Sequence, residues 1–300
     1  ANWAGTSYES GPSRRSIQTT SKRSLRASTL CLHTCAGETP RMEIADVLQW
    51  DDVGDLQVPL ASALRHPIMV VTLTGWFDAA GVATSALAHL VEHQSTRPLA
   101  HIDPDPFYDF TQTRPEARLD EGGERTISWP SNEITLVRNP DGLRDLVVLS
   151  GVEPHVRWRT YIECLIEVYE RTGCEALVTI GASADTRPTY QGITGVIGVL
   201  QAEFEKRSLP AVSLRVGVPH YLANAQHPQS SAALLRHLEH VLGTPTRHAL
   251  LDEEIERWRS LHDDAVSEDD RALNYVRMLE LEFDPEAEAA IPSGDDLAAE

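Results

Sequence analysis

The sequence predicts an α/β protein: a three-layer αβα sandwich with a central mixed, mostly parallel sheet, followed by a helical C-terminal subdomain. Short β-branched apolar runs that end at a glycine recur four times along the chain, and segments with helical spacing of apolar residues lie between them. Continuous apolar runs are typical of strands that are buried on both faces. Strands that alternate with helices form layered α/β sheets.

The expected elements follow in chain order. Strands are expected at residues 68–74, 99–102, 146–150, 177–180 and 212–216. Helices are expected at residues 80–93, 157–171, 194–207 and 230–242. In the first of these helices, Ala83, Leu87 and Leu90 fall on one face, which is the pattern of a helix packed on a sheet.

Two segments interrupt the alternation. Residues 103–140 are rich in Asp, Pro and Arg and are predicted to be an insertion near the sheet edge. This insertion carries a hairpin with strands at 115–119 and 125–129 around an Asp-Glu-Gly-Gly turn. In residues 252–284, apolar positions such as Ile255, Trp258 and Leu261 recur at helical spacing, which predicts the helical subdomain.

Composition divides the chain further. Residues 1–41 hold six basic and two acidic side chains with many Ser and Thr, which predicts a disordered extension. A targeting leader and an extension upstream of Met42 both fit, and the folded-looking sequence after Met42 favours the extension. The expected organisation is therefore an extension (1–41), an α/β domain (42–250), a helical subdomain (251–284) and an acidic tail (285–300).

Charge narrows the classes of partner. The chain has 45 acidic and 26 basic residues, a formal net charge of −19. Because such a surface repels phosphate backbones and anionic lipid, no nucleic-acid or membrane partner is expected. The apolar runs are far shorter than the ~20 residues of a bilayer helix. We expect a cytoplasmic protein in which Cys164 and Cys174 stay reduced.

Polar side chains follow the predicted strands at the edge where ligands bind in open α/β sheets. The candidate ligand-binding rim consists of Asp78, Asp103, Glu153, Asp185, Arg187 and His220. Carboxylates, an arginine and a histidine can perform acid–base chemistry or bind a polar ligand. Structural roles are open as well: Asp78 can cap the helix that follows it, and Asp185 can pair with Arg187.

Other motifs give weaker indications. The run from Gly181 to Asp185 resembles a nucleophile elbow around Ser183, with His220 as a possible base, but it ends in Asp instead of Gly. The run from His89 to His93 matches the H-x-x-E-H pattern, and an exposed helix end explains it more simply. There is no Walker loop or dinucleotide fingerprint, so no cofactor or metal is expected and catalytic residues stay unassigned.

Several motifs, in order, resemble those of one family. They are Gly75-Trp76-Phe77-Asp78-Ala79-Ala80-Gly81, the run from Asp103 to Phe110, Arg114-Pro115, and Gly181-Ala182 with Asp185 and Arg187-Pro188. Over about residues 43–280 the chain is similar to the proteasome assembly chaperone type-two family, in its actinobacterial branch. The resemblance implies a phosphorylase/hydrolase-like fold similar to that of nucleoside phosphorylases, and a homo-oligomer. It supplies no catalytic residues.

Two functions follow from different observations. The resemblance favours an assembly or interaction factor, a homo-oligomer (a trimer is favoured) with a possible protein client. The rim carboxylates favour a nucleoside-binding or nucleoside-cleaving enzyme, and some relatives are considered ATP-grasp-associated ligases. Relatives that dock onto proteasome rings share a C-terminal tail with a hydrophobic residue and a tyrosine. This chain ends in Leu-Ala-Ala-Glu, so docking by that route is not expected.

Overall fold

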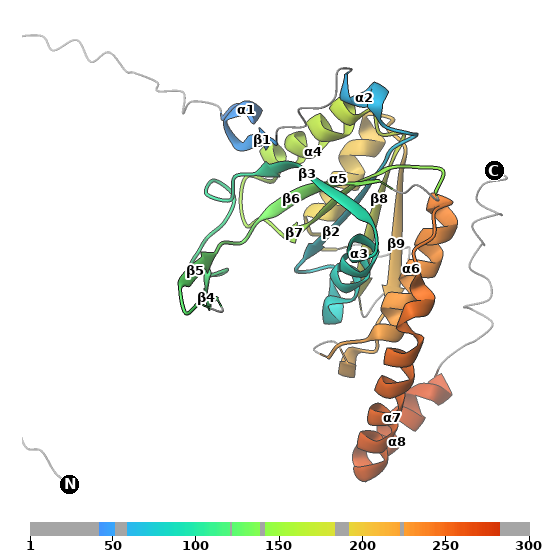
Figure 1. Ribbon diagram of the computed structural model, residues 1–300. Coiled ribbons are helices and arrows are strands. Elements are labelled where there is room, and N and C mark those ends of the chain that lie inside the picture. The colour runs from blue at the N-terminus through green and yellow to red at the C-terminus, as the bar shows by residue number, and fades with distance from the viewer. Residues whose placement is uncertain are drawn as a thin grey trace, which may run out of the picture. The chain divides into compact units, whose positions relative to one another are not determined.

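A seven-stranded sheet forms the centre of the computed structural model, with helices on both of its faces (Figure 1). The structure describes residues 42–51, 59–120, 122–138, 142–183, 192–222 and 225–282. The extension predicted for residues 1–41 and the tail predicted for 285–300 lie outside them. The predicted α/β sandwich with a mixed sheet is confirmed.

Half of the main sheet is parallel and half is antiparallel. The strand order is β1-β3-β6-β7-β2-β8-β9. The parallel half consists of β7 (Leu146–Val152), β2 (Ile68–Thr74), β8 (Ala176–Ser183) and β9 (Ala211–Gly217). The antiparallel half adds β6 (Asn132–Arg138), β3 (Ser95–Ile102) and β1 (Leu48–Trp50). The four strands of the parallel half therefore end at one edge of the sheet.

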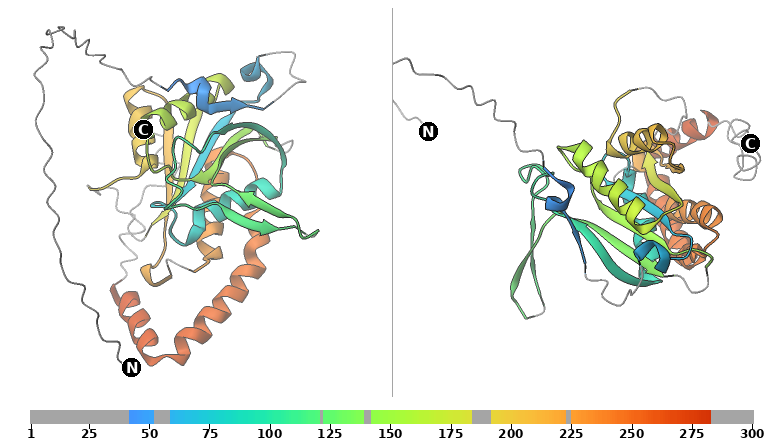
Figure 2. Two further views of the ribbon diagram at one scale, coloured as in Figure 1. Left: turned by 90° about the vertical axis from the view of Figure 1, so that its left-hand side faces the viewer. Right: turned by 90° about the horizontal axis from the view of Figure 1, so that it is seen from above.

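The helices form two layers around this sheet (Figure 2). On one face, α4 (Trp158–Thr172) and α5 (Val196–Lys206) bury side chains such as Leu165 and Leu200. On the other face, α3 (Val82–Glu92) and α6 (Pro228–Leu242) bury Leu87 and Leu238. Two short helices, α1 (Ile44–Val47) and α2 (Leu60–Ala63), precede β1 and β2 respectively. The predicted helices match these four long ones within a few residues.

The insertion predicted for residues 103–140 is only partly correct. Its hairpin is present as β4 (Glu116–Leu119) and β5 (Arg125–Ser128), a separate two-stranded sheet. Residues 132–138, however, form β6 inside the main sheet, between β3 and β7. In β6 the buried residues Asn132, Ile134 and Leu136 alternate with more exposed ones, which is typical of an antiparallel strand. A search for continuous apolar runs passes over such a strand.

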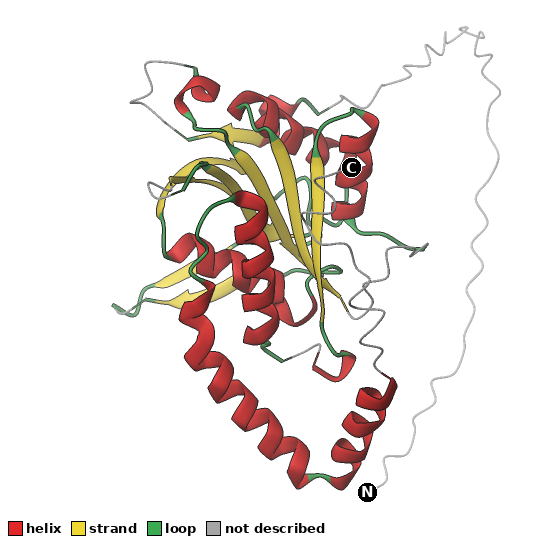
Figure 3. Cartoon of the chain, turned by 90° about the vertical axis from the view of Figure 1, so that its right-hand side faces the viewer, coloured by secondary structure: helices red, strands yellow, loops and turns green. Residues whose placement is uncertain are grey.

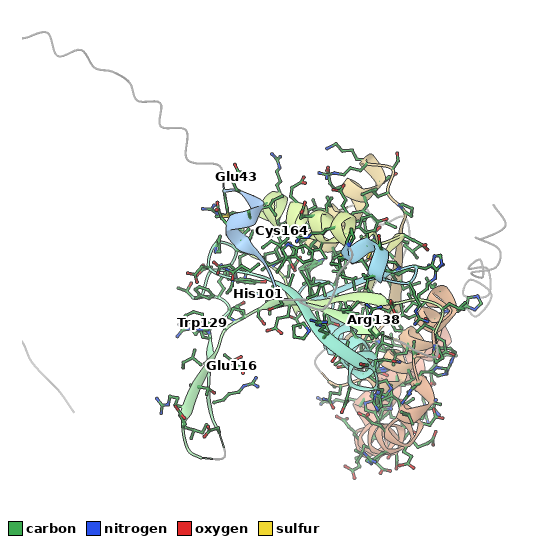
Figure 4. The ribbon with its side chains drawn as sticks, turned by 45° about the horizontal axis from the view of Figure 1, so that its top comes forward. Glu43, His101, Glu116, Trp129, Arg138 and Cys164 are labelled. Carbon is green, nitrogen blue, oxygen red and sulfur yellow. The ribbon has the colours of Figure 1, made fainter. Side chains whose placement is uncertain are left out.

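The β4–β5 hairpin projects from the body of the protein (Figure 4). All eight of its strand residues are exposed. At its base, the rings of Phe110 and Trp129 meet edge to face with centroids 4.9 Å apart. The hairpin therefore makes its contact with the body near its base rather than along its length.

The predicted C-terminal helical subdomain consists of two helices. They are α7 (Asp252–Glu268), after the short 3-10 turn η3 (His248–Leu251), and α8 (Asp270–Glu282). Figure 3 shows α7 running away from the layered core and α8 turning back at an angle to it. In the part of the chain that the structure describes, no helix is both long and apolar enough to cross a membrane.

A buried carboxylate joins the segments at the amino ends of the strands. Asp145 is fully buried just before β7. Its Oδ2 accepts hydrogen bonds from the backbone N–H of Arg65 at 2.9 Å and from Arg138 Nη1 at 2.8 Å. Arg138 also donates to the carbonyl of Ala63 at 3.0 Å. One side chain thus connects the start of β7, the end of β6 and the segment that leads into β2.

We expect Asp145→Asn to lower the free energy of unfolding by about 2–3 kcal/mol, because the two arginines lose the buried charge that pairs with them. The loss stays at the lower end of the range for buried pairs because both arginines are partly solvated. Urea unfolding measures it. The control is Glu116→Gln, which removes an exposed ion pair with Arg118 and is expected to change stability by less than about 0.5 kcal/mol. Equal effects of the two substitutions would contradict the role of Asp145.

Candidate functional site

The carboxyl ends of the parallel strands form the candidate site. Loops that begin at Gly75, Glu153 and Val218 follow β2, β7 and β9 there. The strand β3 runs in the same direction as β7, because each is antiparallel to β6, so Asp103 follows at the same edge. Asp185 and Arg187, two of the predicted rim residues, lie outside the described residues.

Asp78 caps a helix. It is 8% exposed, its Oδ1 accepts the backbone N–H of Ala83 at 2.7 Å, and its Oδ2 accepts the hydroxyl of Thr84 at 2.6 Å. Burial raises the pKa of this carboxyl above its ordinary value, while the hydrogen bonds oppose the shift. The carboxylate therefore satisfies the free N–H groups at the start of α3, the structural role that the sequence left open.

Glu153 connects three segments. Its Oε2 accepts the backbone N–H of Trp76 at 3.2 Å, and its Oε1 accepts the backbone N–H of Val196, at the start of α5, at 2.7 Å. A Cβ atom at Gly75 would lie 2.7 Å from Oε2, and one at Gly195 would lie 2.4 Å from Oε1. A side chain at either position would displace the carboxylate from the N–H groups that donate to it. Gly75 also has φ +142°, which disfavours other residues.

The loop after β2 is also held by the neighbouring strands. The carbonyl of Phe77 accepts the backbone N–H of Ala182, in β8, at 2.7 Å. The guanidinium of Arg215, in β9, lies over the ring of Phe77 at 4.6 Å from its centroid. This cation–π contact and the backbone hydrogen bond keep the Phe77 ring at the rim while Trp76 points to solvent, 62% exposed.

Asp103 begins a turn whose apolar residues enter the core. Its Oδ1 accepts the backbone N–H of Asp105 at 3.1 Å. Downstream, Phe107 and Tyr108 are buried, and the Tyr108 hydroxyl donates to the carbonyl of Val152 at 2.5 Å. The aromatic pair that marks this motif in the sequence thus serves packing. Asp103 serves the turn.

A buried polar cluster lies beneath the rim, and the sequence analysis did not predict it. The amide of Asn132 donates to the hydroxyl of Tyr108, and burial raises the pKa of both Tyr108 and Tyr161. Asn132 Oδ1 and the Tyr161 hydroxyl are buried without a hydrogen-bond partner among the described residues. A Cβ atom at Gly151 would lie only 1.8 Å from Asn132 Oδ1, so the cluster is tightly packed.

The two histidines at this edge serve different neighbours. His155 Nδ1 accepts the backbone N–H of Asp109 at 2.9 Å. Hydrogen bonds from Thr111 and Gln112 lower the pKa of Asp109 to about 2. His220 forms a hydrogen bond through Nε2 with the hydroxyl of Tyr275, in α8. Its ring nitrogen therefore faces the C-terminal helices.

The predicted rim residues do not form one reactive centre. Within the described ranges, no hydrogen bond or ion pair joins any two of Asp78, Asp103, Glu153 and His220. No group of three metal-ligating side chains is present among these residues either. In the H-x-x-E-H run, His89 Nε2 contacts the carbonyl of Arg247, and His93 Nδ1 contacts the carbonyl of His89. These histidines serve the helix end, as the simpler interpretation held.

What the edge presents instead is apolar. Among the described residues of the loops that follow β2, β7, β8 and β9, four large hydrophobic ones are exposed, and we call them the carboxyl-edge residues: Trp76 (62%), Val156 (48%), Ile193 (75%) and Tyr221 (38%). The sequence analysis missed them because it searched these loops for polar chemistry. A tryptophan directly after the Gly75 turn was the available signal.

These features define an α/β protein whose rim, where the structure describes it, exposes large apolar side chains and holds carboxylates that support the fold. The chain matches the model of the PAC2 family over residues 72–266. A PAC2 family protein from Streptomyces avermitilis is 30% identical, with 70% of this chain and 99% of that chain covered and a TM-score of 0.64. A proteasome-assembly chaperone homologue from Mycobacterium tuberculosis is 32% identical, with the same coverage and the same TM-score of 0.64.

A protein of unknown function from Corynebacterium glutamicum is 20% identical, with 81% of this chain and 99% of that chain covered and a TM-score of 0.72. At that identity the likeness concerns the fold alone. The comparison with curated proteins gives no match. The chain belongs to the PAC2 family, as its sequence motifs predicted.

We expect Glu153→Ala to lower the free energy of unfolding by about 1–3 kcal/mol, because the N–H groups of Trp76 and Val196 lose their acceptor. Hydrogen exchange at the two amides should accelerate in parallel, and urea unfolding measures the stability. Asp103→Asn, which retains an acceptor oxygen for its turn, serves as the control and is expected to be near neutral. Unchanged exchange at both amides in Glu153→Ala would show that the carboxylate does not hold this loop.

Proposed function

We propose that this chain is an assembly factor that binds another protein through the carboxyl-edge residues. The observation that carries the proposal is that the polar and the apolar side chains at the rim have different roles. Asp78, Asp103 and Glu153 accept hydrogen bonds from the chain itself, whereas Trp76, Val156 and Ile193 remain exposed. Exposed hydrophobic residues that gather at one edge are typical of protein interaction sites, and tryptophan often dominates their affinity.

The proposed partner is an unassembled proteasome subunit. The support for it is the proteasome-assembly chaperone homologue from M. tuberculosis, 32% identical over 70% of this chain. A protein partner also agrees with the formal net charge of −19, which disfavours nucleic acid and anionic membranes. The proposed place of action is the cytoplasm.

We expect the purified chain to bind purified, unassembled proteasome subunits of its source organism, and Trp76→Ala to weaken that binding by about tenfold or more. Isothermal titration calorimetry measures the dissociation constant. The matched control is Leu143→Ala, which removes a residue that is 75% exposed before β7, at the opposite edge. No binding by the wild-type chain would contradict the partner, and equal effects of the two substitutions would contradict the surface.

A ligand screen separates this function from the enzymatic alternative. The thermal shift of the wild-type chain is measured with nucleosides, inorganic phosphate and ATP. An assembly factor of the proposed kind should show no shift. A reproducible increase in melting temperature with a nucleoside would favour a nucleoside-binding enzyme.

We also propose that the chain forms a homo-oligomer, with a trimer favoured. The support comes from the β4–β5 hairpin. One of its faces carries Ala117, Leu119 and Ile127, together with Arg125 opposite Leu119, because side chains alternate between the two faces along each strand. Leu119 is 69% and Ile127 51% exposed. A two-stranded hairpin is only marginally stable alone in water, so this apolar face favours a position against a second copy.

For the oligomer, light scattering at micromolar concentration should give three times the chain mass of 33.1 kDa. The double variant Leu119→Asp, Ile127→Asp should lower the measured mass towards that of one chain, because it places charges in the apolar face. Thr126→Asp on the opposite face is the control and should leave the mass unchanged. A monomeric wild-type chain would contradict the proposal.

A further inference from the structure

The helix α7 lies against the start of α6 at one buried histidine, and Arg259 Nε of α7 also donates a hydrogen bond to Gln229 Oε1 of α6 at 3.2 Å. His227, 9% exposed, is the N-cap residue of α6, and its Nδ1 accepts the backbone N–H of Ser230 at 3.1 Å. The ring of Trp258, in α7, meets the His227 ring with centroids 4.5 Å apart. Ile255, one turn earlier in α7, is 8% exposed. The contact of Trp258 with His227 therefore holds α7 in place where it begins to leave the core.

The contact continues towards the rim as a series of rings. His262 stacks on Trp258 with centroids 5.2 Å apart and planes at 19°. Tyr221, in the 3-10 turn η2 (His220–Leu222) after β9, lies between the two C-terminal helices, with its ring centroid 6.1 Å from that of His262 and 6.3 Å from that of Tyr275. We use the name aromatic seam for the following six residues: His220, Tyr221, His227, Trp258, His262 and Tyr275. It joins α6, α7, η2 and α8, whose course Figure 3 shows.

The charged groups around the aromatic seam are not the same for each histidine. His262 Nδ1 lies 3.2 Å from the carboxylate of Asp263, so this histidine has a counter-charge on its own helix. Burial, and then the charge of Glu280 in α8, raise the pKa of Tyr221 above its ordinary value. His227 faces the N-terminal N–H groups of α6 and, from α7, His262. Among the contacts of His227 with described residues there is no carboxylate.

We propose that the pair α7–α8 is a pH-dependent clamp, which opens when His227 takes up a proton. A proton on Nδ1 removes the acceptor for the Ser230 N–H and places a positive charge at a helix N-terminus, where the helix dipole opposes it. The charged ring must then reach water, and Trp258 covers it. Release of Trp258 removes the ring contact that holds α7 on α6, so α7 and its neighbour Tyr221, one of the carboxyl-edge residues, are held less firmly.

The direction of the pH dependence follows from the pKa of His227. Burial lowers that pKa below its ordinary value of 6.5 in the closed state; a backbone hydrogen bond of the ring opposes this shift, and the nearby His262 adds to it. The open state therefore binds the proton more tightly than the closed state does. Closure is fully favoured above pH 6.5 and weakens as the pH falls below that value.

Hydrogen exchange of the full chain tests the clamp. We compare α7 and α8 at about pH 7.5 and about pH 5.5, corrected for the intrinsic pH dependence of exchange. In the wild-type chain, protection of both helices should fall by up to about tenfold at the lower pH, the limit for one proton at one pH unit below 6.5. In His227→Asn the fall should disappear, because asparagine caps α6 without titrating.

His237→Gln removes an exposed histidine from the same helix and should respond as the wild-type chain does. If His227→Asn does not fold, His227→Asp supplies another strong N-cap residue for the same comparison. A wild-type chain whose α7 and α8 show no loss of protection overturns the proposal. So does a loss of equal size in the His227 variant. Because the helices themselves are measured, the result does not depend on whether the carboxyl-edge residues bind a partner.

Discussion

The carboxylate of Glu153 determines how the carboxyl edge of the sheet is built. Parallel strands end side by side and leave loops that must be held together by something other than the strand ladder. One side chain after β7 does this by accepting an N–H from the loop after β2 and an N–H from the start of α5. The glycines at 75 and 195 follow from it, since any side chain there would meet the carboxylate. The exposed position of Trp76 follows as well.

The same carboxylate explains why a rim rich in acids need not be catalytic. Acids at the ends of buried strands are close to free N–H groups, at helix starts and in tight turns, and these groups need acceptors when water is excluded. Asp78, Asp103 and Glu153 each meet such a need. With these acids engaged, the large side chains exposed in the described part of the edge include apolar ones such as Trp76 and Ile193, which contact protein surfaces better than polar substrates.

The layered fold, the parallel strands and the long helices were predictable from the sequence. Strands that are buried on both faces appear as continuous apolar runs, and helices that pack on a sheet show apolar residues at helical spacing. The strand β6 was not, since Glu133 and Thr135 interrupt its apolar residues and its pairing with β3 and β7 is set by tertiary contacts. At the site, sequence placed Asp78, Glu153 and His220 at the correct edge. Their partners, such as the N–H of Val196 for Glu153 and Tyr275 for His220, lie far along the chain. Spacing in the sequence does not report such contacts.

The division of the sheet into two halves has a consequence for the order of folding. The strands β6 and β7 are antiparallel neighbours that follow each other directly in the chain, whereas β2 pairs with β7 and β8 only after long stretches of sequence have been brought back. The entropy lost on closing a loop grows with its length, so the local pair forms at the lower cost. The antiparallel pair can therefore form first and offer β7 as an edge on which β2 assembles, with β8 and β9 added outward by crossovers. In that order, the groups that meet Glu153 come together only once β2 has been added and the start of α5 is in place.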